Sequence, residues 1–198
     1  MNRRATLTLT TMALLCITVA LPAGDAAAQQ KTLKEQLVGT WTLVSYEDIN
    51  PNGTKKQYQG ASPRGILVLD ASGRYVWVEA PSGRPKLKGS RVDATAEEFH
   101  AAVGTFVANF GSWSVNEADK TLIRQVEGAL IPNAEGKEAG ADATCIPARP
   151  VGSCRDIVSV AGDELKITQP AVVSVLNQTI TVTEHQAAVT EIVFKRAK

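Results

Sequence analysis

Short runs of alternating apolar and polar residues, separated by turn residues, recur along this chain. The runs are rich in Val, Ile, Leu, Thr and aromatic residues, which favour the pleated, half-buried surface of a sheet. They predict strands at residues 39–47, 65–70, 74–79, 112–115, 121–128, 155–160, 164–168, 179–185 and 189–196. The short polar links at 116–120 and 161–163 favour antiparallel pairing of consecutive strands, and Gly73 supplies the positive φ of a hairpin turn. The pattern therefore predicts an all-β chain.

One segment, residues 95–109, has the period of a helix instead. Thr95 and Glu98 form the signature of a capping box, and Phe99, Val103 and Phe106 recur at helical spacing. Gly104 lowers the stability of this helix by about 1 kcal/mol relative to alanine, so we expect the helix to depend on packing against the β structure.

The first 28 residues have the pattern of a secretory signal peptide. Arg3 and Arg4 precede an apolar run at 13–21, and three alanines at 26–28 provide the cleavage site. The apolar run is shorter than the span of about 20 residues that a membrane helix needs. We expect a mature domain, residues 29–198, that works in the periplasm or outside the cell and has no membrane span.

Export changes how the three cysteines are interpreted. Cys16 lies inside the signal segment and is removed with it, so Cys145 and Cys154 remain. In an oxidising compartment this pair, in C-I-P-A-R-P-V-G-S-C, predicts one disulfide that closes a loop. A metal site at these cysteines is disfavoured, because the sequence has neither C-x-x-C spacing nor a histidine nearby.

The charge of the mature chain excludes two classes of partner. Without Arg3, Arg4 and Asp25, the 21 basic and 20 acidic side chains of the full chain become 19 of each. A net charge near zero gives no basic face for nucleic acid or for an anionic membrane. We therefore expect no nucleic-acid partner.

Candidate catalytic groups are few. The chain has two histidines, His100 and His185, and no G-x-S-x-G nucleophile motif. With no third histidine to complete a ligand set, we expect no metal and no other cofactor. One catalytic alternative stays open, in which Glu79 and Glu127, on different predicted strands, form an acid/base pair inside a barrel.

The predicted strand at 74–79 carries side chains suited to binding. Alternation in R-Y-V-W-V-E places Tyr75, Trp77 and Glu79 on one face. Aromatic side chains that also carry a polar atom suit a pocket that holds an apolar ligand and orients it through a few hydrogen bonds. The alternative, that the tryptophans only fill the core, stays open.

The predicted strand at 121–128 offers a second set. Leu122, Arg124 and Val126 share a face, and Arg124 there could receive a carboxylate or phenolate group of a ligand. In the alternative, Arg124 points to solvent.

Several sequence blocks, taken in order, resemble the bacterial lipocalin-like domain family. The blocks are L-V-G-T-W at 37–41, G-R-Y at 73–75, N-F-G-S-W at 109–113, V-E-G-A-L-I-P-N at 126–133 and G-D-E-L-K-I-T at 162–168. The resemblance implies an up-and-down antiparallel β-barrel of about eight strands around a small-molecule cavity, with Trp41 closing one end. In such a barrel the helix would lie over one mouth or against the wall. The chain departs from the family at Arg124 and Gln125, where members often carry histidines, and its cysteine loop suggests an exported subgroup.

Together these observations favour an exported protein that binds a small hydrophobic or amphipathic molecule in the barrel cavity. Two alternatives from other classes stay open. One is a small cofactor-independent barrel enzyme, such as an isomerase, cyclase or hydrolase. The other is an exported interaction module that acts like a protease inhibitor. The sequence makes no prediction of the oligomeric state.

Overall fold

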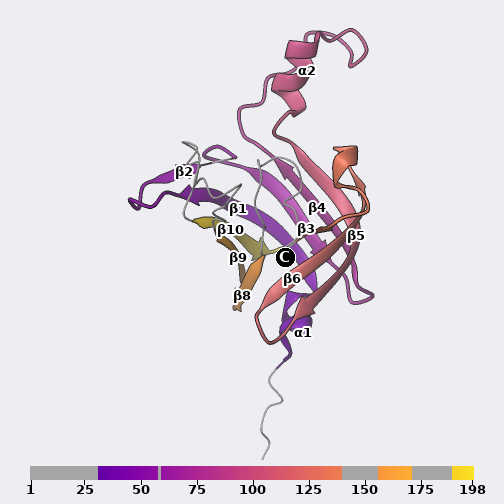
Figure 1. Cartoon of the computed structure of the whole chain (residues 1–198). Helices are drawn as coiled ribbons and strands as arrows, with labels where there is room; N and C mark the ends of the chain where they lie inside the picture. The colour runs from indigo at the N-terminus through magenta and orange to yellow at the C-terminus, as the bar shows by residue number, and fades with distance from the viewer. Residues whose placement is uncertain (1–30, 58, 140–155, 171–188) are drawn as a thin grey trace, which may run out of the picture. The chain divides into compact units, whose positions relative to one another are not determined.

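The computed structural model describes residues 31–57, 59–139, 156–170 and 189–198 (Figure 1). Within these ranges strands dominate, and most of them are joined by short turns. The elements are α1 (Leu33–Leu37), β1 (Gly39–Ile49), β2 (Lys55–Gln57), β3 (Arg64–Leu69), β4 (Arg74–Ala80), α2 (Ala96–Val103), β5 (Val107–Asn116), β6 (Thr121–Ala129), the 3-10 helix η1 (Pro132–Ala134), β7 (Glu138–Ala139), β8 (Ile157–Ala161), β9 (Glu164–Pro170) and β10 (Val189–Arg196).

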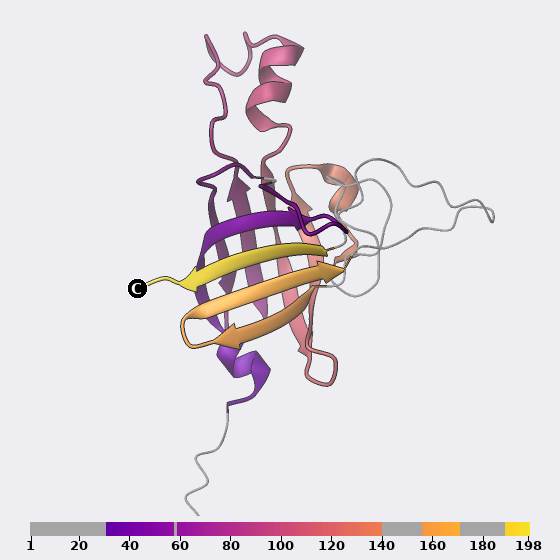
Figure 2. The same cartoon turned by 90° about the vertical axis from the view of Figure 1, so that its left-hand side faces the viewer.

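Eight of these strands form a closed antiparallel barrel. The order around the barrel is β1, β3, β4, β5, β6, β8, β9 and β10, and β10 pairs with β1 along its whole length to close the sheet. The short strands β2 and β7 add to β1 and β6. Figure 2 shows β8, β9 and β10 crossing in front of the strands of the opposite wall, as the strand tilt of a small barrel requires. The predicted all-β, up-and-down barrel is confirmed.

The turn between β3 and β4 illustrates how local sequence sets the pairing. Gly73 has a φ of 88° and donates its backbone N–H to the carbonyl of Asp70. The Asp70 carboxylate accepts from the backbone N–H of Arg74 at 2.8 Å. A side chain with a Cβ at the position of Gly73 would be strained by this positive φ. The hairpin that follows pairs Leu69 with Tyr75, which sets the register of β4.

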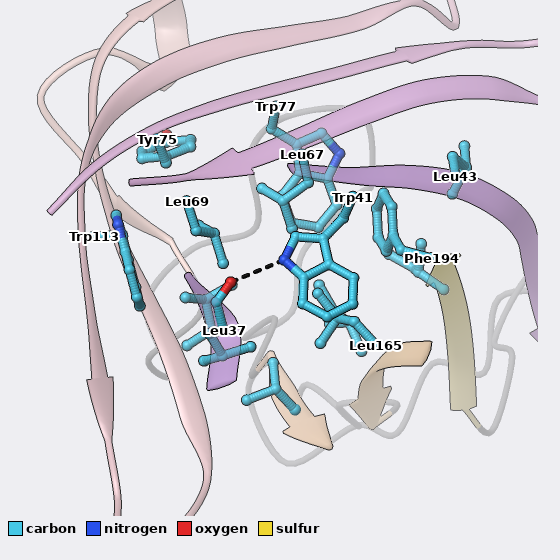
Figure 3. Close-up of a cluster of buried hydrophobic side chains, with 14 of the residues drawn as sticks. Leu37, Trp41, Leu43, Leu67, Leu69, Tyr75, Trp77, Trp113, Leu165 and Phe194 are labelled. Atoms are coloured by element: carbon cyan, nitrogen blue, oxygen red, sulfur yellow. Dashed lines mark hydrogen bonds between the residues drawn. The ribbon is translucent and has the colours of Figure 1, made fainter. Parts of the chain in front are cut away.

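One end of the barrel is filled by large apolar side chains and closed by α1 (Figure 3). Trp41 is fully buried there, and its Nε1–H donates to the carbonyl of Leu37 at 2.8 Å. Leu67, Leu69 and Leu165 are also fully buried. Because the indole N–H has a partner, Trp41 contributes its whole apolar surface to this core without leaving a buried donor unpaired.

The helix α1 is held in place at both of its ends. Thr32 and Glu35 form a capping box at its start, where the Glu117 carboxylate also accepts from the backbone N–H groups of Leu33 and Lys34 at 3.0 and 2.9 Å. Beyond its other end, Arg196 of β10 donates to the carbonyl of Val38 at 2.9 Å. These contacts hold the short helix in a fixed position at the end of the barrel.

The helix α2 is shorter than the predicted 95–109 and does not lie against the barrel wall. Its capping box of Thr95 and Glu98 is present, but the helix ends at Val103 because residues from Val107 onward pair with β4 as part of β5. Figures 1 and 2 show α2 beyond the ends of the strands, and Phe99 is 39% exposed. The position against the barrel wall is therefore contradicted, whereas the position at a mouth is consistent with a helix beyond the strand ends, where β4 ends and β5 begins.

Several predictions fall on residues outside the described ranges. These are the signal peptide, the strand at 179–185, His185, and the pair Cys145 and Cys154. Among the described residues, the sequence pattern missed α1, β2, η1 and β7, each of which spans five residues or fewer. Such short elements contain too few residues to show a period.

Candidate functional site

The inward-facing positions of several strands change from apolar to polar with distance from α1. With increasing distance from α1, the order on β4 is Tyr75, Trp77 and Glu79. On β9 it is Leu165, Ile167 and Gln169, and on β10 it is Phe194, Ile192 and Thr190. All nine residues are buried. We call the region around Leu37, Trp41, Leu67, Leu69, Trp113 and Leu165 the apolar end. We call the buried residues Gln59, Tyr75, Trp77, Glu79, Asn109, Arg124, Asp156 and Gln169 the polar cluster.

Three β4 side chains share one face, as their alternation predicts, and the structure places that face in the barrel interior. Tyr75, Trp77 and Glu79 are 2%, 3% and 2% exposed. The Glu79 carboxylate accepts from Trp77 Nε1 at 2.8 Å and from Gln59 Nε2 at 3.1 Å. The Tyr75 hydroxyl donates to Asn109 Oδ1 at 2.9 Å. These bonds orient both aromatic rings within the barrel, where Tyr75 and Trp77 are also part of the main buried core.

Arg124 lies inside the barrel, and the alternative that it points to solvent is wrong. It is 5% exposed, and its Nη2 donates to Asp156 Oδ2 at 2.5 Å. Gln169 Nε2 donates to the other oxygen of the same carboxylate at 2.6 Å. The guanidinium carbon lies 4.2 Å from the centre of the Trp77 ring. A buried charge is tolerated only when it is paired and hydrogen-bonded, and Arg124 meets both conditions.

The two apolar residues predicted to share the face of Arg124 have different neighbours. Leu122 is fully buried in the main core with the apolar end. Val126 is buried in a second, smaller cluster with Ala134 of η1 and Ala139 of β7. Of the β6 residues singled out from the sequence, Arg124 has the contacts with Tyr75 and Trp77.

Burial also keeps the Tyr75 phenol protonated. Removal from water raises its pKa above the usual 10, and the nearby positive charge of Arg124 opposes this effect without cancelling it. The neutral hydroxyl therefore acts as the donor in the hydrogen bond to Asn109.

Three buried atoms of the polar cluster have no hydrogen-bond partner within the described part of the chain. They are Arg124 Nε, Asn109 Nδ2 and Gln59 Oε1. Buried polar atoms in native proteins almost always have a partner, and each one that lacks it costs about 1–3 kcal/mol. Two of the three atoms are donors on side chains that are at most 5% exposed. The cluster therefore has hydrogen-bonding capacity that the described residues do not use.

The proposed acid/base pair of Glu79 and Glu127 is contradicted. Glu127 lies on the outer face of β6, where its Oε2 accepts from Arg74 Nη2 at 2.8 Å and its side chain is 46% exposed. The Arg74 guanidinium lowers the pKa of this exposed carboxylate. Glu79 is buried on the other side of the wall, so the two carboxylates cannot act on one substrate.

Two further sequence expectations concern metals and membranes. In residues 31–57, 59–139, 156–170 and 189–198, three or more histidine, cysteine or acidic side chains are nowhere grouped as metal ligands would be. His100 is exposed on α2. A search of the same residues finds no helix with the length and apolar character needed to cross a bilayer.

Four residues of the cluster were missed by sequence reasoning. Asp156 and Gln169 lie in or beside predicted strands, Asn109 ends the segment predicted as a helix, and Gln59 lies between two predicted strands. The burial of these polar residues could not be read from composition. Alternation with Leu165 and Ile167 places Gln169 on the inward face, which is the one signal that could have identified it.

The family comparison agrees with this architecture. Residues 38–147 match the model of a family described as a lipocalin-like domain. The matched range contains β1 to β7, and hence Tyr75, Trp77 and Arg124, whereas Asp156 and Gln169 lie beyond it. A search of curated proteins finds no match.

Proposed function

Because the match covers more than half of its residues, the chain belongs to the lipocalin-like domain family, and we propose that it is an exported protein that binds a small hydrophobic or amphipathic molecule inside its barrel. The closed barrel fold and the family membership support binding of this general type. The nature of the molecule and the export of the protein belong to the proposal.

The observation that carries the proposal is the set of buried atoms without partners in the polar cluster. Arg124 Nε and Asn109 Nδ2 are donors on side chains that flank Tyr75. The Arg124 guanidinium lies 5.7 Å from the centre of the Tyr75 ring, and Asn109 Oδ1 accepts from the Tyr75 hydroxyl. A ligand that brings hydrogen-bond acceptors to these two donors would remove the free-energy cost of burying them without partners. Trp77 and Tyr75 supply aromatic surface for the apolar part of such a ligand.

The apolar end has no comparable capacity. Trp41, Leu67 and Leu69 are fully buried against one another and against α1, and the indole N–H of Trp41 already has its acceptor. We therefore place the polar group of the ligand at the polar cluster. The one acid/base pair that the sequence suggested for the enzyme alternative, Glu79 and Glu127, lies on opposite faces of the wall.

Export and the disulfide form the second part of the proposal. Residues 1–28 have the signal-peptide pattern, and removal of them leaves Cys145 and Cys154 as the two cysteines of the mature chain. The mass of the intact exported protein, measured before and after alkylation without a reducing agent, tests both points. We expect a chain that begins near Gln29 and takes up no alkyl group, and two reactive thiols would contradict the disulfide.

Native mass spectrometry of the exported protein, followed by titration with an apolar fluorescent probe, tests binding. We expect a bound small molecule or probe that quenches tryptophan emission. At 100 times its dissociation constant, the probe should stabilise the protein by about 2.7 kcal/mol, because it binds only the folded state. Absence of binding across fatty acids, aromatic acids, isoprenoids and their neutral derivatives would contradict the proposed function.

A matched pair of tryptophan variants then locates the binding region. Trp77→Ala should weaken probe binding well beyond its effect on stability, because Trp77 lies in the polar cluster against Arg124. Trp113→Ala should change binding less, since the indole N–H of Trp113 donates to the backbone carbonyl of Asp70 in the turn near the apolar end. Equal effects of the two variants on binding would contradict this location.

A further inference from the structure

A second pocket lies at the base of the excursion that carries α2. Figures 1 and 2 show α2 beyond the barrel end that lies away from α1. The pocket has a volume of about 320 Å³, and its walls come from the start of β3, from the segment after β4 and from the end of α2. Sites for small molecules typically measure about 300–1,000 Å³. No residue of the polar cluster lines this pocket, so it is a separate candidate site.

The pocket is lined by basic residues and by no acidic one. Arg64, Arg84 and Lys86 are three of its eight lining residues. The nearby Lys88 is paired with Glu98, whereas no ion pair joins the three lining cations to an acidic side chain among the described residues. Like charges gathered in a concave site attract ligands of the opposite sign. The pocket therefore favours an anion.

Arg84 is held so that one edge of its guanidinium has no partner in the described part of the chain. Its Nη1 donates to the carbonyl of Ala102 at 3.0 Å, and its guanidinium carbon lies 4.8 Å from the centre of the Phe106 ring. The other edge is formed by Nε and Nη2, and Nε is a buried donor without a hydrogen bond there. Carboxylate and phosphate groups can accept two parallel hydrogen bonds from such an edge.

The remaining wall of the pocket is largely apolar. Pro81, Pro85, Ala102 and Val103 line it with ring and methyl groups. An inorganic ion would use only the cations, whereas a ligand with a short apolar body would also bury that surface, which contributes about 25 cal/mol per Å². The wall therefore favours an organic anion over an inorganic one.

We propose that this pocket is a second binding site, which takes a small organic anion. The three lining cations hold the carboxylate or phosphate group of the ligand, and its apolar part lies against the prolines and Val103. The inference goes beyond the proposed function, because the site shares no residue with the polar cluster and does not depend on what the barrel binds.

Calorimetric titration of the mature exported protein with phenyl phosphate and with benzoate tests the site. We expect binding that weakens as the salt concentration rises, because salt screens the lining cations. Benzyl alcohol lacks the charge and inorganic phosphate lacks the ring, so each should bind about tenfold or more weakly than phenyl phosphate. Absence of binding by both organic anions, or equally tight binding of benzyl alcohol or inorganic phosphate, would overturn the proposal.

A pair of charge variants locates the anion. Arg84→Gln should weaken binding of phenyl phosphate about tenfold or more, because it removes the guanidinium edge. The control is Lys88→Gln, which removes a nearby cation that is 90% exposed and does not line the pocket, and it should leave binding unchanged. If Arg84→Gln does not fold, the double variant of the exposed Arg64 and Lys86 to Gln should weaken binding to a similar extent. Affinity equal to that of Lys88→Gln in these variants would overturn the proposal.

A final comparison separates this site from the barrel interior. Phenyl phosphate should shift the backbone amide NMR signals of Gly83 and Val103 and should leave the apolar fluorescent probe bound. Displacement of the probe without a shift at Gly83 and Val103 would place the anion in the barrel and overturn this inference alone. A protein that binds phenyl phosphate at these residues but no apolar probe would contradict the proposed function and support the second site.

Discussion

At the apolar end, large side chains pack against one another and their polar atoms have backbone partners, whereas in the polar cluster charged side chains meet and some buried atoms lack partners. Trp41 and Trp113 both donate to main-chain carbonyls. Arg124 instead pairs with Asp156, and its Nε has no partner within the described residues. One region of the same barrel is thus arranged for stability, and the other retains the polar atoms that recognition requires.

The largest effect should come from the apolar end. Trp41→Ala removes a fully buried indole and leaves the carbonyl of Leu37 without its donor, so it should lower the free energy of unfolding by about 3–5 kcal/mol. Urea denaturation of the wild-type and variant proteins measures this change. A variant of unchanged stability would show that Trp41 does not close the barrel.

The next effect concerns the buried ion pair. Arg124→Met leaves Asp156 as a buried charge without its cation, which should cost about 3 kcal/mol of stability. Asp156→Leu added to Arg124→Met should recover much of that loss, because two apolar side chains replace the pair. A double variant no more stable than Arg124→Met alone would contradict the coupling of these two residues.

The polar cluster was only partly predictable from the sequence, and the reason is the range of the interactions. A period of two residues was enough to place Tyr75, Trp77 and Glu79 on one face and to predict β10 at residues 189–196. The burial of Arg124 depends on Asp156, which is 32 residues away along the chain and beyond β7. No local pattern contains that contact.

The misplaced helix boundary has a similar origin. Phe106 and Val107 continue the helical spacing of the segment that begins at Thr95, so local pattern alone extends α2 through them. Val107 instead pairs with Glu79 of β4, and the strand pairing determines its conformation. The apolar end was more predictable, because its residues, including Trp41, are apolar and alternate.

The smallest effect should appear at alkaline pH and should come from Tyr75. Its folded-state pKa is raised above the usual value of 10, because burial disfavours the phenolate. The contribution of this group to stability is therefore complete below about pH 10 and is lost as the pH rises through the folded-state pKa. Tyr75→Phe should reduce the fall in stability above pH 10, as followed by urea denaturation at several pH values. An unchanged alkaline slope would show that the phenol is not desolvated as the barrel requires.

The most direct measurement is the NMR signal of the Arg124 Nε–H during titration with a ligand that carries a hydrogen-bond acceptor and displaces the fluorescent probe, assigned by its loss in Arg124→Lys. We predict that this signal shifts and exchanges more slowly with water as the ligand binds, since the atom gains an acceptor. The Nε–H of Arg74, which lies outside the barrel in an exposed ion pair, should not change. Binding of the ligand without any change at Arg124 would contradict the claim that the polar cluster is the site of recognition.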